Sequence, residues 1–111
     1  MNRDVKEITD WLEQFRGQEL VITKLEQQDE DLTQVQLKEV SLDTPAHAQD
    51  DDYIPQYELV LHGDGIVMNE NQAPLPGKKY EIPLQGDWQS SIEESTLHLT
   101  TDRAEYTITR Q

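Results

Sequence analysis

The spacing of apolar residues changes at Gly17, and this change limits the folds open to the chain. Before Gly17 the apolar residues recur every three or four positions, at Val5, Ile8, Leu12 and Phe15. This spacing predicts a helix over residues 3–16, and glycine is a common residue just beyond a helix end. After Gly17, apolar and polar residues alternate in short runs, as they do in strands with one buried face. We therefore expect an antiparallel β region over residues 18–109.

The first part of the β region reads as one long hairpin. The acidic cluster Gln28–Asp31 is expected to form its turn. The alternation then slips by one position between Leu37 and Val40. An extra residue near Lys38 and Glu39 would keep the same face buried, so the slip predicts a β-bulge there.

The second part of the β region contains further short strands. A strand through Tyr57 and Leu61 is expected to turn at His62–Gly65 and return through Ile66–Met68. Residues 80–84 form another strand, which Pro83 restricts to a sheet edge or a bulge because proline has no N–H to donate. The last hairpin pairs two segments through a turn at 101–103, with Leu97 and Leu99 on one strand and Tyr106 and Ile108 on the other.

Together these elements predict a fold of the α+β class, mainly antiparallel β. One N-terminal helix is followed by six or seven strands in a small barrel or strongly curved sheet. The length of 111 residues suits a single domain over 1–111. Two stretches without periodicity, 43–55 and 69–79, are expected to be mobile loops.

Two segments of the β region resemble each other. Tyr57–Asp64 and Tyr80–Asp87 share Tyr, Glu, a Leu or Ile, Leu, Gly and Asp at matching positions. Two copies are too few for a repeat protein, so we interpret them as two strands in similar environments. The alternative is a pseudo-symmetric site at which Asp64 and Asp87 approach each other.

The charge of the chain excludes several functions. It has 23 acidic and 9 basic side chains, a formal net charge of −14. Such a surface repels bare nucleic acid and anionic membranes, so we expect neither as a partner. The absence of cysteine excludes disulfides, cysteine–zinc sites and thiol catalysis. No long apolar stretch and no signal-peptide pattern occur, so a soluble, cytoplasmic protein is expected.

No motif for catalysis, cofactors or metal ions is evident. The chain has no Gly-x-Ser-x-Gly elbow and no glycine-rich phosphate loop, so we expect neither an enzyme nor a cofactor. Carboxylates gather at Asp50–Asp52 and in turns at Asp64 and Asp87. They lack the alternating spacing of a calcium loop, which favours a solubilising role, although binding of a divalent cation stays open.

The remaining interpretation is a non-catalytic protein-interaction or accessory domain, with the partner and the oligomeric state left open. The helix carries acids on the side opposite its apolar arc, and two tryptophans are candidate anchors. The candidate interaction surface comprises Glu7, Asp10, Trp11, Glu13 and Trp88. For Trp88, folding back over the core is the favoured interpretation, and an exposed interface anchor is the alternative.

An inhibitor that imitates DNA is the alternative function, because dense carboxylates can occupy a basic nucleic-acid groove. Two segments, Gly17–Ile22 and Leu99–Tyr106, resemble short segments of the phage uracil-DNA glycosylase inhibitors. Those inhibitors are acidic proteins with a helix and a sheet that imitate DNA. That resemblance implies protein binding through acidic side chains, but Lys24 and Leu25 stand where those inhibitors carry polar contact residues. The segment Leu37–Asp43 is similar to the opening of Sm-like barrels, without their basic RNA-binding motif. We assign neither family.

Overall fold

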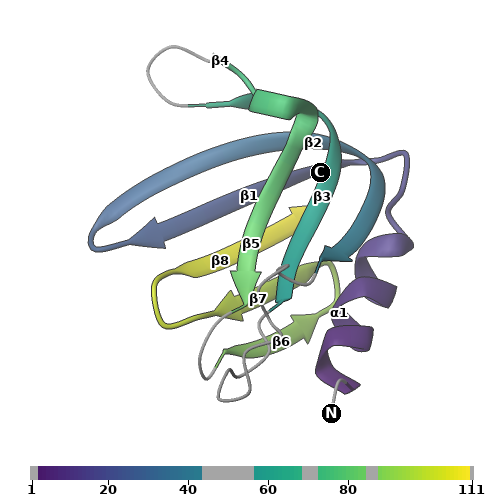
Figure 1. Ribbon diagram of the computed structural model, residues 1–111, viewed down its shortest axis with the longest axis vertical. Helices are drawn as coiled ribbons and strands as arrows, with labels where there is room; N and C mark the ends of the chain where they lie inside the picture. The colour runs from purple at the N-terminus through teal and green to yellow at the C-terminus, as the bar shows by residue number, and fades with distance from the viewer. Residues whose placement is uncertain (1–2, 44–56, 69–72, 85–87, 111) are drawn as a thin grey trace.

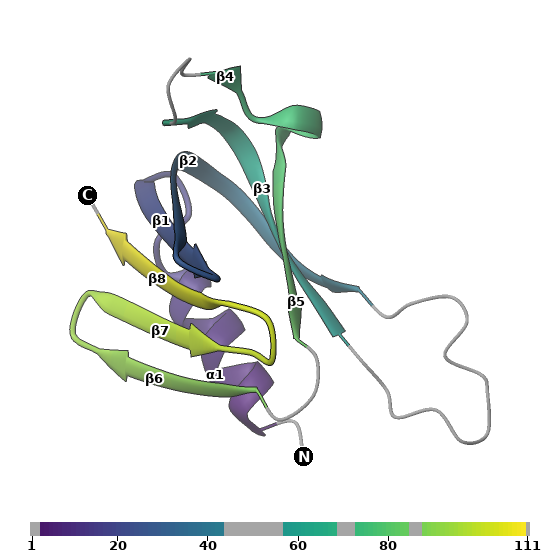
Figure 2. The same cartoon turned by 90° about the vertical axis from the view of Figure 1, so that its left-hand side faces the viewer.

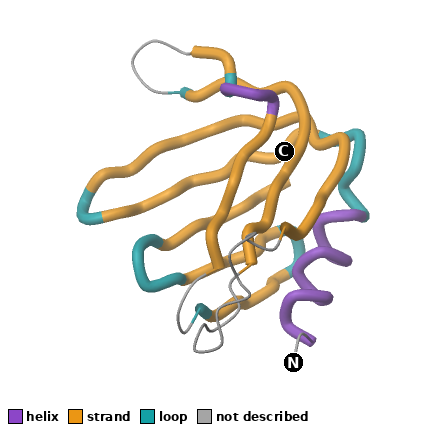
Figure 3. Tube along the Cα trace, viewed as in Figure 1, coloured by secondary structure: helices purple, strands orange, loops and turns teal. Residues whose placement is uncertain are grey.

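The computed structural model describes residues 3–43, 57–68, 73–84 and 88–110. In these residues one helix precedes eight antiparallel strands that form a strongly curled, half-barrel sheet (Figures 1 and 3). The predicted fold class is confirmed. The strand count exceeds the expected six or seven because β4 and β6 had no clear alternation in the sequence.

The elements follow the chain in this order: α1 (Arg3–Glu13), β1 (Glu19–Glu26), β2 (Asp29–Asp43), β3 (Tyr57–Val67), β4 (Ala73–Pro74), the short 3₁₀ helix η1 (Pro76–Lys78), β5 (Lys79–Leu84), β6 (Gln89–Glu93), β7 (Thr96–Thr100) and β8 (Glu105–Arg110). The order in the sheet is β4-β3-β2-β1-β8-β7-β6, and β5 also pairs with β3. Figure 2 shows how far the sheet curls between β5 and β6.

Helix α1 places its apolar side in the core. It contacts β2 and β6, and its residues Ile8 and Leu12 are fully buried. The helix ends at Glu13, earlier than the expected residue 16, and residues 14–17 form a turn. Gly17 adopts a φ of 85° there, and its N–H donates to the carbonyl of Leu37 at 2.7 Å. This hydrogen bond ties the end of the helix to β2.

The β1–β2 hairpin turns earlier than predicted. Its turn residues are Gln27 and Gln28, both with positive φ, and β2 already begins at Asp29. The acidic cluster therefore pairs with β1, with Glu30 opposite Leu25. A two-residue turn with positive φ at both positions matches the right-handed twist of paired strands, which a longer turn would match less well. The predicted bulge is confirmed, since the β2–β3 register shifts between Leu37 and Glu39.

The prediction of a turn at His62–Gly65 is wrong. β3 runs without interruption from Tyr57 to Val67, and Gly63 and Gly65 lie inside it. A Cβ atom on Gly63 would lie 1.9 Å from the carbonyl oxygen of Gln36, and one on Gly65 would lie 2.6 Å from that of Gln34. The two glycines therefore allow close approach of two backbones, which is a recognised use of glycine in strands.

Strand β5 lies at a sheet edge, as Pro83 predicted, because β3 is its one partner among the described residues. The two similar segments turn out to be neighbours: Leu59 pairs with Ile82, and Leu61 pairs with Tyr80. This pairing explains their shared pattern, since both strands bury the same kind of face. The alternative site lies partly outside the described residues, because they do not include Asp87.

The outcomes for the two expected loops differ. Residues 44–56 and 69–72, which hold most of one loop and part of the other, lie outside the described residues. Residues 73–79 form β4, η1 and the first residue of β5, and Leu75 between them is buried. The expected hairpin at the end of the chain is confirmed, with Leu99 opposite Tyr106. Among the described residues, no helix has the length and apolar character needed to cross a membrane.

Candidate interaction surface

A groove lies between helix α1 and strand β6. Its volume is about 520 Å³, and its lining residues are Glu7, Asp10, Trp11, Gln14, Ser90 and Ile92. Strand β6 is the last strand in the sheet order, so one of its edges has no strand partner among the described residues. Ser90 and Ile92 pair with Leu99 and Leu97 and therefore share their inward-facing side of the sheet. The groove thus continues the core toward an open sheet edge.

Of the four predicted surface residues on the helix, Glu13 is half-buried and does not line the groove, and the other three fall into two groups. Glu7 and Asp10 are exposed and line the groove, as expected for the polar side of α1. Trp11 is 6% exposed and packs edge-on against Phe15, with ring centroids 4.7 Å apart. The structure therefore places Trp11 in the core, with limited contact to the groove. Its burial follows from its position beside Leu12, where it extends the apolar side of the helix.

The acidic charges on the helix are partly compensated by cations on the helix and in the turn that follows it. Lys6 Nζ lies 2.8 Å from a carboxylate oxygen of Asp10, and Arg16 Nε lies 2.8 Å from one of Glu13. The hydrogen bond and the negative charge of Asp10 raise the pKa of Lys6. Exposed pairs of this kind contribute little to stability. Glu7 makes no ion pair with any side chain that the structure describes.

The two tryptophans do not come together as one exposed anchor. Trp88 is half-buried and packs against the core just before β6, which agrees with the favoured interpretation that it folds back. The exposed apolar side chain at the groove is Ile92, which is 39% exposed. The sequence did not reveal it, because Ser90, Ser91 and Glu93 around it show no apolar alternation.

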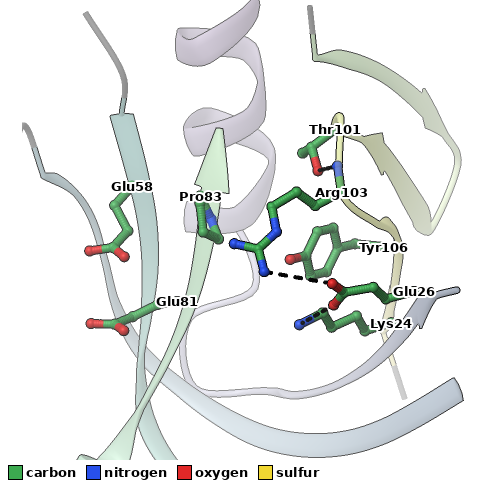
Figure 4. A pocket seen from close by; sticks show the side chains of 8 residues that line it. All are labelled: Lys24, Glu26, Glu58, Glu81, Pro83, Thr101, Arg103 and Tyr106. Carbon is green, nitrogen blue, oxygen red and sulfur yellow. Dashed lines mark hydrogen bonds and ion pairs between the residues drawn. The ribbon is translucent and has the colours of Figure 1, made fainter. Parts of the chain in front are cut away.

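A second, smaller cavity of about 180 Å³ opens between β5 and the β1–β8 pair (Figure 4). Glu26 joins two cations in it: its carboxylate lies 3.3 Å from Lys24 Nζ and 3.7 Å from Arg103 Nη2. The Lys24 ammonium also lies 5.9 Å from the ring centroid of Tyr106. Thr101 Oγ1 stabilises the turn between β7 and β8 by accepting a hydrogen bond from the backbone N–H of Arg103 at 3.2 Å. In Figure 4, Glu58 and Glu81 point away from Arg103, on the far side of Pro83.

In and near this cavity, burial raises the pKa of three groups. Burial raises the pKa of Tyr106, Lys24 opposes that rise, and burial also raises the pKa of Tyr80. Both phenols therefore stay protonated near neutral pH. Burial raises the pKa of the Glu58 carboxyl too, and the nearby charges of Glu81 and Asp43 add to the rise. The side chains that line the cavity are mostly polar or charged.

Strands β2 and β3 also carry a serine–histidine hydrogen bond, and Asp64 of β3 forms two ion pairs. Ser41 Oγ lies 2.9 Å from His62 Nε2, across β2 and β3. Among the described side chains, no carboxylate bonds to the other ring nitrogen, so the pair lacks the third member that orients a catalytic histidine. Asp64 lies 3.5 Å from Lys38 Nζ and 3.6 Å from Lys78 Nζ.

Of the carboxylates considered as possible ligands of a divalent cation, Asp64 is the one that the structure describes. The described part of the chain contains no group of three or more His, Asp or Glu side chains placed to hold a metal ion. Asp64 instead has two lysines as neighbours. Asp50–Asp52 and Asp87 lie outside the described residues.

Comparison with known proteins identifies a family and a relative of this chain. The model of a family described as "YmzB-like protein" matches residues 1–111. A protein of Bacillus subtilis (strain 168), named "Uncharacterized protein YmzB", is 39% identical over 109 residues, which cover 92% of this chain and 91% of the relative. No solved structure gives a significant match.

Proposed function

The chain belongs to the YmzB-like family, and from this premise we propose that it is a non-catalytic interaction domain that binds an extended segment of another protein beside β6. Neither the family description nor the name of the relative specifies an activity, so the proposal depends on the surface alone. The observation that supports it most is the groove between α1 and the open edge of β6.

An extended segment suits this groove for two reasons. A strand edge without a partner presents backbone N–H and C=O groups that a further strand can pair with. Side chains of the added strand that point inward would lie in line with Ser90 and Ile92 and face the helix. An apolar side chain there would cover Ile92, and a basic one would lie near Glu7. The proposed ligand is therefore an extended segment with apolar and basic side chains on one face.

The imitation of DNA has less support as a function. A DNA mimic needs its carboxylates on one face, at intervals like those of phosphates. Glu7 and Asp10 lie on the helix, on the inner side of the sheet, whereas Glu30 and Glu105 lie on its outer face. The charge is therefore distributed over opposite sides of the molecule. Several acids are also compensated by neighbouring cations, among them Asp10, Glu13 and Asp64.

Binding of a synthetic strand tests the proposal. The probe is the eight-residue peptide Val-Thr-Lys-Thr-Val-Thr-Lys-Thr with blocked ends. Because side chains of a strand alternate between its faces, valine and lysine then share one face, and the β-branched residues favour an extended chain. We expect binding in titration calorimetry, with amide shift changes in NMR spectra concentrated in β6 and α1. The variant Ile92→Glu should weaken binding at least tenfold by placing a charge in the groove.

The variant Leu32→Glu is the matched control, since Leu32 is similarly exposed but lies on the other face of the sheet. It should bind this peptide as the unaltered protein does. Equal weakening by both variants, or shift changes spread evenly over the surface, would contradict a specific site at β6.

A further inference from the structure

The outer face of the sheet carries a belt without charges, which we define as two adjacent cross-strand rows. One row runs through Ile66, Gln34, Val21 and Thr109, and the next runs through Met68, Leu32, Thr23 and Thr107. None of these eight side chains is ionisable. Such a stretch across four strands is unexpected in a chain with a net charge of −14.

The belt is accessible and partly apolar. Leu32 is 37% exposed and Ile66 is 41% exposed, and they lie diagonally across β2 and β3. Val21 and Thr23 continue the surface onto β1, where both are half-buried. Strand spacing of about 4.8 Å and a rise of about 3.4 Å per residue give the belt an area of roughly 260 Å². Val21, Leu32, Ile66 and Met68 form the apolar half of this area, and three threonines and Gln34 form the other half.

The two borders of the belt differ in charge. On one side, Leu25 lies directly between Glu30 and Glu105, and neither acid forms an ion pair with a described side chain. On the other side, the row consists of Asp64, Gln36 and Glu19, and Asp64 is paired with Lys38 and Lys78. The belt therefore has a strongly acidic border on one side and a largely compensated border on the other.

We infer that this belt is a second docking surface, which takes a basic amphipathic segment of a partner protein. The apolar side of the segment covers Leu32 and Ile66, and its lysine or arginine side chains lie over Glu30 and Glu105. Charge complementarity selects this partner over a second copy of the chain, because two copies would bring acidic borders and two charges of −14 together. The surface is independent of the β6 groove, since it lies on the opposite face of the sheet.

The test uses a 14-residue peptide of leucine and lysine, patterned so that all leucines lie on one side of a helix. We expect binding with amide shift changes at Val21, Thr23, Leu32, Ile66 and Thr107. A peptide of the same composition with the leucines distributed around the helix has equal charge and should bind at least tenfold more weakly. Equal affinity of the two peptides would overturn the inference, because charge alone would then explain the binding.

Variants of the belt and its border separate the apolar contribution to binding from the contribution of charge. Leu32→Glu should weaken binding at least tenfold, whereas Ile92→Glu, in the groove, should leave it unchanged. Leu32→Thr, which keeps a strand-forming residue and adds no charge, should weaken binding less. It provides the same test if Leu32→Glu does not fold. The pair Glu30→Gln and Glu105→Gln should lower affinity about fivefold at low salt, as expected for two exposed charge contacts.

Two other results would overturn the inference. Shift changes at β6 and α1 would assign this peptide to the groove and leave the belt without a ligand. A concentration-dependent dimer in sedimentation equilibrium, lost in Leu32→Glu, would make a second copy the occupant. Failure at the belt would not affect the groove, which is tested with a different peptide and a different variant.

Discussion

At the scale of residues, two glycines determine the path of β3. The sequence around Gly63 and Gly65 resembles a hairpin turn, yet the strand continues through it. The reason is the short distance between β3 and the carbonyl groups of Gln34 and Gln36, which leaves no room for a side chain. Without this approach the β2–β3 pair could not pack as closely beside the bulge at Leu37 and Glu39.

The variant Gly63→Ala should therefore be strongly destabilising. Its Cβ would overlap the carbonyl oxygen of Gln36, so the two strands must separate locally. We expect a loss of about 1–3 kcal/mol in the free energy of unfolding, as for other overpacked sites. Urea unfolding followed by circular dichroism measures it.

Gly77→Ala is the control, because Gly77 also has a positive φ, of 66°, but the nearest atom to its Cβ position is 3.8 Å away. Only conformational strain should appear there, about 1 kcal/mol. If both variants lose the same amount, close approach of the backbones is not what requires glycine in β3.

At the scale of elements, the β1–β2 hairpin is built on an unfavourable turn. Gln27 and Gln28 adopt φ values of 51° and 73°, a region that glutamine rarely occupies. The eight cross-strand pairs of the hairpin compensate for this local strain. The same hairpin carries half of the uncharged belt, so its register positions Leu32 and Thr23 opposite each other.

Replacing the turn by Asn-Gly, through Gln27→Asn and Gln28→Gly, should stabilise the protein. Asparagine and glycine accept positive φ at a lower cost, and they are the preferred pair in turns of this type. We expect a gain of about 1 kcal/mol in the free energy of unfolding, measured by thermal or urea denaturation. The pair Gln27→Ala and Gln28→Ala keeps the strain and should give no gain. A similar gain in both pairs would argue against strain at this turn.

At the scale of the whole molecule, the net charge of −14 acts against the compact state. Most described lysine and arginine side chains already pair with an acid, so few remain to offset the rest: these pairs involve Lys6, Arg16, Lys24, Lys38, Lys78, Lys79 and Arg103. Burial raises the pKa of Glu58, and the nearby charges of Glu81 and Asp43 raise it further, which is a local instance of the same repulsion.

Salt should therefore raise the melting temperature of this protein. The Debye length is about 10 Å at 0.1 M ionic strength, so repulsion between surface charges farther apart than this is largely screened above that concentration. We expect a rise of about 4 °C between 10 mM and 300 mM sodium chloride, measured by differential scanning calorimetry. The variant Glu58→Gln removes one member of the crowded cluster and should respond less to salt. A melting temperature that falls with salt would show that attractive pairs outweigh repulsion.

The success of sequence-based prediction differed between parts of the fold. Strong periodicity predicted α1, the bulge after Leu37 and the last hairpin, and Pro83 predicted the edge position of β5. It failed at Gly63–Gly65, where a turn motif also serves close packing of strands. It also missed β6, because an edge strand with Ser90 and Ser91 buries too little to show alternation.

The candidate surfaces were predicted less completely. Glu7 and Asp10 were identified from the helical pattern and do line the groove. Trp11 was expected at the surface but completes the core, and Ile92 was not identified at all. The sequence pattern did not indicate the uncharged belt, because its residues come from four strands and become neighbours only through the register of the sheet.

The sequence by itself determined the class of fold and the charge of the protein, because periodicity and composition are local or summed properties. It also indicated one helix before a β region, since the change of period at Gly17 requires no tertiary contact. The tertiary structure decided which strands are neighbours, where the sheet ends and which side chains share a surface. Those features depend on cross-strand register and on backbone approach, which join residues far apart in the chain. The groove beside β6 and the belt on the outer face both arise in this way.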